Sequence, residues 1–269
     1  DGMPLLPYDY FQVAGDPALH GLGAVFTGVD KAVFDAFTPT VLGLGDVARD
    51  GQYVQALAAI FDLEGFTDFC GQNDSHLVIP EFLSRYLHWL FATLAEQLRV
   101  DETESSVRLW ARMPFYAKFL GDGLLFLWRA DCCHGSVENV NIARSLLVVT
   151  NAYVQTFLPE IRKAVSNPPA RLRCGLAVGQ VISIGGGADF VGPCINEAAR
   201  LQKLCRLSFA MMRRGFDLSQ EPESESALRR LLTLKCTSIR SVGERRLVYI
   251  RNDEFGALSA DEQRLFTEP

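Results

Sequence analysis

The stretch Ile60-Phe61-Asp62-Leu63-Glu64-Gly65-Phe66-Thr67 places an aspartate at the end of a small, apolar run that begins at Ala56. Such a run, closed by a glycine turn, is typical of a buried strand. A second aspartate lies in the stretch Lys118-Phe119-Leu120-Gly121-Asp122-Gly123, where Gly-Asp-Gly between two apolar runs predicts a hairpin. We therefore expect both aspartates to lie in exposed turns at the ends of strands.

Other predicted elements surround these two turns. A leucine stripe over 83–98 predicts a helix after the first strand, and a second apolar stripe predicts a helix over about 138–164, interrupted at Pro159. The remaining predicted elements are a strand over 171–184, a helix over 195–205 and terminal strands over about 232–238 and 247–251.

The order strand, helix, hairpin, helix, strand is the split βαβ, ferredoxin-like arrangement. In this topology the end of the first strand lies beside the tip of the hairpin. Asp62 and Asp122 are therefore expected to converge, although they are far apart in the chain. We predict an α+β fold with a central, mostly antiparallel sheet flanked by helices.

Composition and charge narrow the classes of partner. The 269 residues are 48% hydrophobic, which allows a sizeable core, and the net charge is −6 with a pI near 5.3. An acidic chain without a basic run argues against nucleic acid and against an anionic membrane surface. The seven cysteines include no CxxC pair, and neither a signal peptide nor an apolar run of membrane-spanning length is visible. We expect a cytoplasmic protein with reduced thiols.

Four segments are expected along the chain. Residues 1–2 look like an expression scar before Met3, and residues 3–50 are expected to form an N-terminal helical extension. Residues 51–252 contain the aspartate motifs and are expected to form the catalytic domain, whereas 253–269 are expected to be a C-terminal tail. The chemistry is thus expected in the third segment.

Two carboxylates that converge from neighbouring strands suit hard divalent cations. Mg²⁺ and Mn²⁺ prefer oxygen ligands, so Asp62 and Asp122, with the backbone carbonyl of Leu63, form a candidate site for two such cations. The same turn leads through Phe66 and Thr67 toward a helix, whose first amide groups can bind phosphate. Taken singly, each motif is more often a plain hairpin turn or a helix cap. Together and in this order they indicate metal-dependent phosphoryl chemistry.

A third motif is the run Gly192-Pro193-Cys194-Ile195-Asn196-Glu197-Ala198-Ala199-Arg200. Asn196 and Arg200 are four residues apart on a predicted helix, so both side chains project from one face. An asparagine can position a ribose oxygen, and an arginine can stabilise charge that develops on a phosphate. The simpler alternative is a polar pair on a helix surface.

Together the three motifs resemble the catalytic domain of class III nucleotidyl cyclases, over roughly residues 55–250. The resemblance implies that a nucleoside triphosphate is converted into its 3′,5′-cyclic monophosphate and pyrophosphate with two Mg²⁺ or Mn²⁺ ions. It also implies that Asn196 and Arg200 are catalytic, and that Lys118 and Asp189 select the base. Finally, it implies a homodimer whose active sites are shared between the two chains.

One feature of the family has no clean counterpart in this sequence. The family holds the triphosphate with a lysine near the C-terminus, in a Lys-Gly-Lys-Gly context. Here the neighbouring candidates are Arg240 and Arg245, around Val242-Gly243. We expect one of these two arginines to replace the lysine.

The base is not decided by the selecting pair. Lys118 and Asp189 are the combination found in adenylate cyclases, but adenine (N1 and N6–H) and uracil (O4 and N3–H) satisfy the same two side chains. Phe115, Tyr116 and Phe190 lie beside the pair in sequence, and their bulk would exclude purines by size if they face the pocket and not the core.

The segments 116–123 and 191–196 also resemble the stand-alone pyrimidine cyclases of bacterial Pycsar antiphage systems. In those systems cyclic UMP or cyclic CMP activates a separate effector protein. The resemblance favours UTP, then CTP, as the substrate of this chain.

Two alternatives are an adenylate cyclase and a catalytically silent, cyclase-like domain that binds nucleotides or dimerises. Loss of an aspartate, the asparagine or the arginine would indicate the silent domain. All four are present, which favours an enzyme.

Overall fold

The computed structural model describes residues 9–14, 25–35, 51–73, 75–130, 135–218 and 227–269. The chain divides into two compact units. The smaller consists of Asp1–Gln52 with Ser183–Phe190, and the larger consists of Tyr53–Ile182 with Val191–Pro269.

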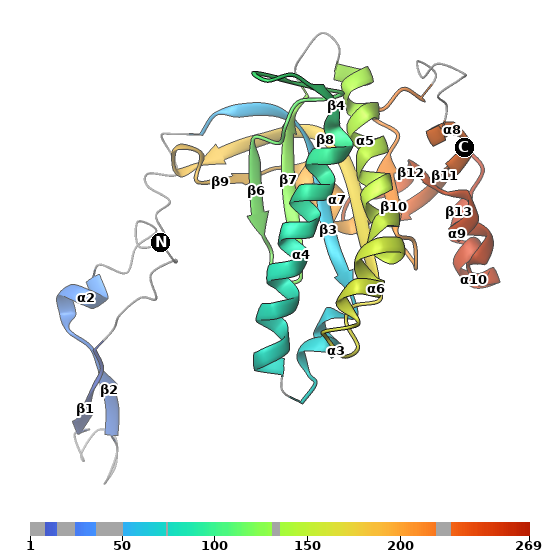
Figure 1. Ribbon diagram of the computed structural model, residues 1–269. Helices are drawn as coiled ribbons and strands as arrows, with labels where there is room; N and C mark the ends of the chain where they lie inside the picture. Colours follow the sequence, from blue (N-terminus) through green and yellow to red (C-terminus); the bar gives the residue numbers. More distant parts are fainter. Residues whose placement is uncertain (1–8, 15–24, 36–50, 74, 131–134, 219–226) are drawn as a thin grey trace. The chain divides into compact units, whose positions relative to one another are not determined.

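Nine strands among the described residues form one sheet, in the order β13-β11-β12-β10-β8-β3-β7-β6, with β9 paired to β8 (Figure 1). β8 and β10 run parallel, and all other neighbours along this path run antiparallel. The strands are β3 (Tyr53–Glu64), β6 (Tyr116–Phe119), β7 (Gly123–Arg129), β8 (Arg171–Ile184), β9 (Asp189–Val191), β10 (Phe209–Met212), β11 (Leu232–Ile239), β12 (Gly243–Arg251) and β13 (Phe266–Thr267).

The predicted split βαβ topology is confirmed. β3 is followed by α4 (Ser75–Leu98), the β6–β7 hairpin, α5 (Gly135–Ala152) and β8. In the sheet these strands lie in the order β8-β3-β7-β6, so β3 pairs with β7 on one side and with β8 on the other. The mostly antiparallel α+β fold that the sequence predicts is therefore correct.

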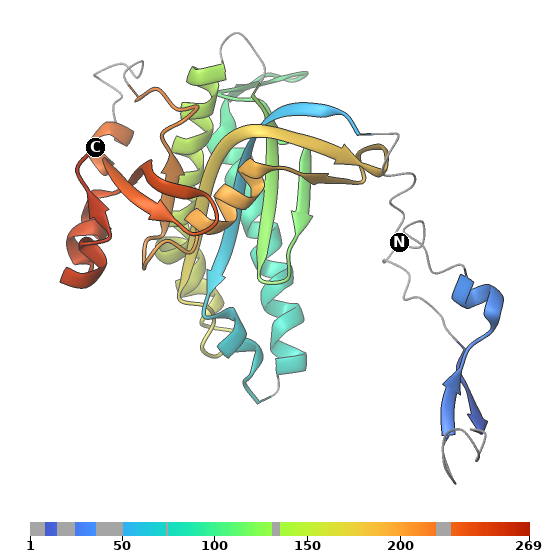
Figure 2. The same ribbon diagram turned by 180° about the vertical axis from the view of Figure 1, so that it is seen from behind.

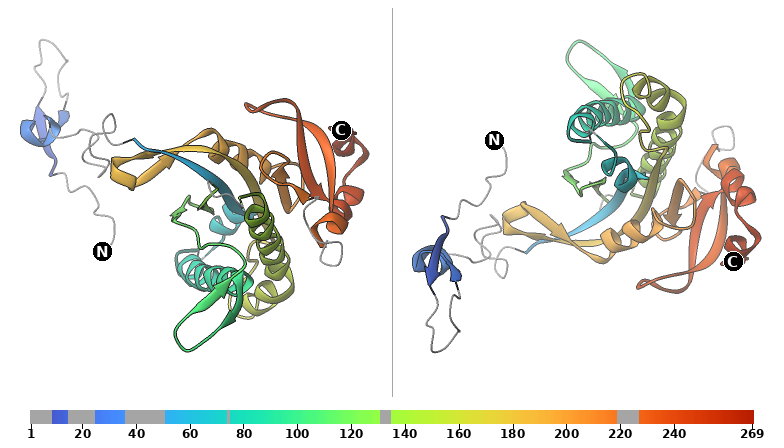
Figure 3. Two further views of the ribbon diagram at one scale, coloured as in Figure 1. Left: turned by 90° about the horizontal axis from the view of Figure 1, so that it is seen from above. Right: turned by 90° about the horizontal axis from the view of Figure 1, so that it is seen from below.

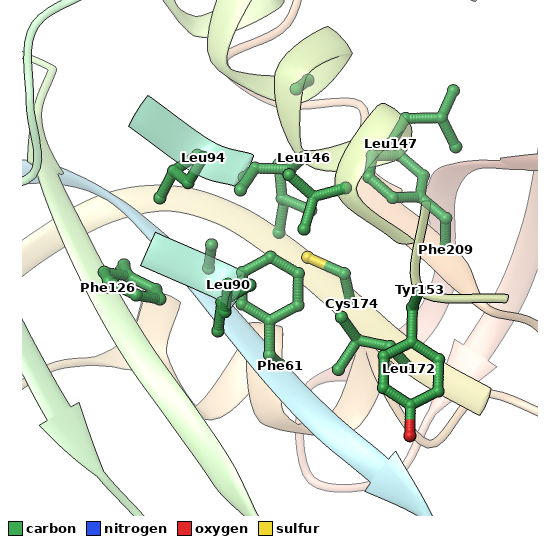
Figure 4. Packing of buried hydrophobic residues seen from close by; sticks show 14 of the residues in the cluster. Phe61, Leu90, Leu94, Phe126, Leu146, Leu147, Tyr153, Leu172, Cys174 and Phe209 are labelled. Atoms are coloured by element: carbon green, nitrogen blue, oxygen red, sulfur yellow. The ribbon is translucent and has the colours of Figure 1, made fainter. Parts of the chain in front are cut away.

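Helices cover both faces of this sheet within the larger unit. α4 and α5 lie together on one face, whereas α7 (Pro193–Leu201) lies on the other, as the views from the front, from behind and along the vertical axis show (Figures 1, 2 and 3). The core forms beneath α4 and α5, where Phe61 of β3 packs near Leu90 and Leu146 (Figure 4). Because strand side chains alternate, Asp62 points to the opposite face, toward the side where α7 packs on β3.

Some predicted elements are divided in the structure. The helix expected over 138–164 is α5, a π-helical turn over Tyr153–Phe157 and α6 (Leu158–Ile161). The π turn immediately precedes the turn that holds Pro159, which has no amide hydrogen to donate and so disrupts the regular ladder.

The segment expected to be a C-terminal tail is ordered. Residues 253–269 contribute to α9 (Asn252–Ala257), α10 (Ala260–Gln263) and β13, which pairs with β11. The side chain of Ser259 caps α10 in a capping box with Glu262. A local signal of this kind was present in the sequence and was missed.

The smaller unit contains an antiparallel strand pair, β1 (Phe11–Ala14) with β2 (Val25–Gly28), and the short helix α2 (Lys31–Asp35). Asp30 begins this helix, since its Oδ1 accepts a hydrogen bond of 2.8 Å from the amide of Ala32. The sequence predicted helices over 3–50 and no strand pair. The remaining residues of that prediction lie outside the described residues.

A close approach of α7 to the sheet depends on Gly175 of β8. A Cβ at this position would lie 2.2 Å from the carbonyl oxygen of Ala198 and 2.5 Å from the amide nitrogen of Gln202. Both are backbone atoms, so no side-chain rotation relieves the clash. We expect Gly175→Ala to lower the free energy of unfolding by about 3 kcal/mol, measured by urea denaturation.

Gly256 in α9 is the matched control, because a Cβ there would meet no atom within 4 Å. Gly256→Ala is expected to change the free energy of unfolding by less than about 0.5 kcal/mol. Equal denaturation midpoints for the two variants would show that α7 does not need this glycine.

Candidate functional site

Strand register brings the two predicted aspartates together. Asp62 of β3 lies opposite Gly123 of β7, the residue that follows Asp122 in the hairpin turn. The amide of Leu63 donates a hydrogen bond of 3.2 Å to the carbonyl oxygen of Asp122. The convergence expected from the split βαβ topology is thus a direct consequence of the β3–β7 pairing.

Asp62 does not lie in an exposed turn, contrary to the sequence prediction. β3 continues to Glu64, and the side chain of Asp62 is only 4% exposed. Its Oδ2 accepts a hydrogen bond of 3.0 Å from Nε of Arg173 and a second bond from the same guanidinium. Arg173 is directly opposite Asp62 in the β3–β8 register and is itself 16% exposed, so the pair is largely buried.

A second cation stands near the same carboxylate. Nζ of Lys203 lies 3.9 Å from Oδ1 of Asp62, and the lysine side chain is 59% exposed. Asp122, in the neighbouring turn, is half-buried. Burial raises the pKa of the Cys70 thiol at the end of α3 (Phe66–Cys70), and the negative charge of Asp122 raises it further.

A pocket of about 470 Å³ opens beside these groups. Four residues that the sequence singled out line it: Asp62, Asp122, Asn196 and Arg200. The other lining residues are Ile60, Phe61, Leu120, Gly123, Ala199, Gln202, Lys203, Ser241 and Val242. The structure therefore brings both aspartates and the asparagine–arginine pair of one chain to a single hollow.

α7 presents the asparagine and the arginine because its two faces differ in polarity. Pro193 begins the helix, where a missing amide hydrogen costs nothing, and Cys194, Ala198 and Leu201 are buried. Asn196 and Arg200 lie on the exposed part of the helix surface.

The turn after β3 leaves Phe66 and Thr67, the residues expected to bind phosphate, outside the pocket lining. Phe66 packs its ring against Phe69 and Phe82, with centroids 5.9 and 6.4 Å away, so its side chain belongs to the aromatic core. Thr67 is exposed in the short α3. Since the amide of Leu63 already bonds to Asp122, that amide has no hydrogen left for a phosphate. Phe66 and Thr67 are not among the pocket-lining residues, and their phosphate role stays a prediction.

The predicted base-selecting residues lie on two different strands. Lys118 is exposed and Tyr116 half-buried on β6, whereas Asp189 is the first residue of β9 and belongs to the smaller unit. Neither Lys118 nor Tyr116 lines the pocket described above. Phe115 is 39% exposed, with the guanidinium of Arg129 5.8 Å from its ring centre, so this phenylalanine is not a core residue.

The two arginines expected to hold the triphosphate lie close in sequence to residues that line the pocket, but they do not line it themselves. Arg240 is exposed directly after β11, and Arg245 is exposed within β12. The turn between these strands contributes Ser241 and Val242 to the pocket. Ser241 and Arg245 both have positive φ, 65° and 52°, in a region that non-glycine residues seldom occupy.

Arg173 and Lys203, the two cations beside Asp62, are not among the residues that the sequence motifs indicate. A signal for Arg173 existed, because it alternates with the buried Leu172 and Cys174 on a predicted strand and must face the other side of the sheet. Its pairing with Asp62 depends on the β3–β8 register, which the sequence does not show.

The residues present fit divalent cations that also bind substrate phosphates. Among the described residues no group of three or more His, Cys, Asp or Glu side chains could hold a metal ion by itself. Asp62 and Asp122 supply two carboxylates at one pocket, and Mg²⁺ is commonly bound by one or two carboxylates plus substrate phosphates and water.

Comparisons with known proteins address the fold. No protein-family model matches the sequence, and no curated protein matches it. Among solved structures, the adenylyl cyclase CyaB from P. aeruginosa matches with a TM-score of 0.53 at 12% identity, over 75% of this chain and 95% of that one. The chain has the class III nucleotidyl cyclase fold.

Two further cyclases also match, with TM-scores below 0.5. The guanylyl cyclase Cya2 matches with a TM-score of 0.49 at 14% identity, over 75% of this chain and 93% of that one. A bacterial light-regulated adenylyl cyclase matches with a TM-score of 0.49 at 16% identity, over 76% of this chain but only 53% of its own length. Within the described part of this cyclase-fold chain, no helix has the length and apolar character needed to cross a membrane.

Proposed function

We propose that this protein is a nucleotidyl cyclase, which converts a nucleoside triphosphate into the 3′,5′-cyclic monophosphate and pyrophosphate. One observation carries the proposal: Asp62, Asp122, Asn196 and Arg200 line a single pocket on a class III cyclase fold. A silent nucleotide-binding module would not need all four chemical groups in one place.

The reaction forms a bond between the 3′-oxygen and the α-phosphorus and breaks the bond between the α-phosphorus and the bridging oxygen of pyrophosphate. The hydroxyl proton leaves to solvent or a phosphate oxygen. Asp62 and Asp122 would hold two Mg²⁺ or Mn²⁺ ions with the carbonyl of Leu63, and such ions acidify a hydroxyl and offset phosphate charge. Arg200 donates to oxygens of the α-phosphate, where charge increases, and Asn196 orients the ribose.

We further propose that the substrate is a pyrimidine nucleotide, UTP before CTP, with Lys118 and Asp189 reading the base. Support comes from the residues beside Lys118. Tyr116 is half-buried and Phe115 is partly exposed, so neither ring lies wholly in the core, and bulky rings beside Lys118 would limit the size of a bound base. The cyclic product would act in the cytoplasm on a separate effector protein, as the resemblance to the antiphage cyclases implies.

Base preference is tested by incubating the purified chain with each of the four nucleoside triphosphates and Mn²⁺, and identifying the cyclic products by mass spectrometry. We expect UTP or CTP to exceed ATP and GTP by at least about tenfold in kcat/KM, which corresponds to about 1.4 kcal/mol. Tyr116→Ala is expected to narrow that difference, because a smaller side chain admits the larger ring. A preference for ATP would make the protein an adenylate cyclase, and no cyclic product from any of the four would favour the silent module.

A further inference from the structure

The pocket contains a cation that the sequence motifs do not include. We propose that Lys203 is the residue that binds the β- and γ-phosphates, and that it exchanges Asp62 for phosphate when a nucleotide arrives. This inference rests on the proposed cyclase function, since it assigns a residue to the triphosphate of that substrate.

The position of Lys203 follows from helix geometry. Asn196, Arg200 and Lys203 are spaced by four and then three residues, which places them along one side of α7 and the turn that ends it. All three line the pocket, with Asp62 and Asp122 in the same lining. If Arg200 contacts the α-phosphate, then Lys203, the next cation along this side of the helix, is in position to contact the β- and γ-phosphates.

Two cations lie beside Asp62, namely Arg173 and Lys203, and Lys203 is the one that can move away from the carboxylate. Its side chain is 59% exposed and its Nζ is 3.9 Å from the carboxylate, a distance longer than a hydrogen bond. Arg173, by contrast, is 16% exposed and bonds to the same carboxylate at 3.0 Å. Because the lysine side chain is mostly exposed and the contact to the buried carboxylate is long, this ion pair is weak, so an incoming polyphosphate displaces it at little cost.

The charges of the site support an exchange. Asp62, Asp122, Arg200 and Lys203 are the charged residues that line the pocket, and two negative and two positive side chains sum to zero. Two divalent cations offset the about four negative charges of a triphosphate, so their joint arrival leaves this balance unchanged. Metal alone would leave Lys203 facing added positive charge, and triphosphate alone would add negative charge beside both aspartates.

The arginines that the sequence suggested for this role are less well placed. Arg240 and Arg245 are exposed on either side of the β11–β12 turn, and the pocket is lined there by Ser241 and Val242. Lys203 is the lysine among the pocket-lining residues of the described chain.

Titration calorimetry of the full chain with inorganic tripolyphosphate and Mn²⁺ tests the proposal without requiring turnover. We expect Lys203→Gln to weaken the Kd for tripolyphosphate about tenfold, as one lost charge-assisted contact predicts, and Lys203→Arg to stay within about threefold of the wild type. Lys163→Gln is the matched control, because Lys163 pairs with Glu160 at 2.7 Å and does not line the pocket. It should bind as the wild type does.

Thermal unfolding of each variant shows that the fold is retained, which is expected because Lys203 is mostly exposed. Wild-type affinity in Lys203→Gln, or a tenfold loss confined to Arg240→Gln, would overturn the assignment. A wild-type protein that binds Mn²⁺–tripolyphosphate through Lys203 but forms no cyclic product would refute the cyclase proposal and leave the phosphate site standing. A wild-type protein that binds no tripolyphosphate would refute the phosphate site itself.

Discussion

Asp122→Asn is expected to abolish cyclic nucleotide formation while the protein stays folded. The change removes one of the two carboxylates that would hold the divalent cations. Because the transition state then loses several kcal/mol of stabilisation by the metal ions, kcat is expected to fall at least about a thousandfold. Asp122 is half-buried in a hairpin turn, so little packing is lost. The measurement is initial rate with the preferred triphosphate at saturating Mn²⁺, with circular dichroism as the check on folding.

Asp62→Asn is expected to lose the same activity and also some stability. Arg173 is 16% exposed and would keep its charge without a counter-ion, which we expect to cost about 2–3 kcal/mol, below the usual range for a broken buried pair because some solvent reaches it. Adding Arg173→Gln should recover part of the stability and none of the turnover. If either single aspartate variant retains near wild-type rates at saturating Mn²⁺, the two-metal assignment is wrong.

Activity is expected to return when two dead variants are mixed. The resemblance to cyclases implies that the aspartates of one chain face Asn196 and Arg200 of another in a two-fold dimer, the commonest assembly of soluble homo-oligomers. A mixed dimer of Asp62→Ala and Arg200→Ala would have one site with both lesions and one with neither. At equal amounts and random exchange, about a quarter of wild-type activity should return.

The single chain offers a competing arrangement, because Asp62, Asp122, Asn196 and Arg200 of one chain line one pocket. The mixing experiment distinguishes this complete site from the shared one. Differently tagged copies that purify together would demonstrate exchange. Exchange without recovered activity would assign complete sites to individual chains. A mixture of Arg200→Ala with Asn196→Ala is the negative control. In a shared site one chain supplies both Asn196 and Arg200, so each site of a mixed dimer would lack one of these two side chains and no intact site would form.

The sequence predicts the elements of this fold best where local pattern and topology agree. The apolar run that ends at Asp62, the Gly121–Gly123 turn and the leucine stripe predict β3, the β6–β7 hairpin and α4, because each has its own periodicity or turn chemistry. The short β10 and β13 were missed, since strands of four and two residues have too few side chains to show alternation.

The residues of the candidate site also fall into two groups, those that the sequence indicates and those that only the folded chain reveals. The sequence by itself determined which residues could carry the chemistry, because Asp62, Asp122, Asn196 and Arg200 lie in motifs whose spacing is readable along the chain. Only the tertiary structure decided that Asp62 is buried against Arg173 and that Lys203 faces the same carboxylate. These contacts join residues more than a hundred positions apart through the β3–β8 register and the packing of α7 on the sheet, and no local pattern encodes a strand register.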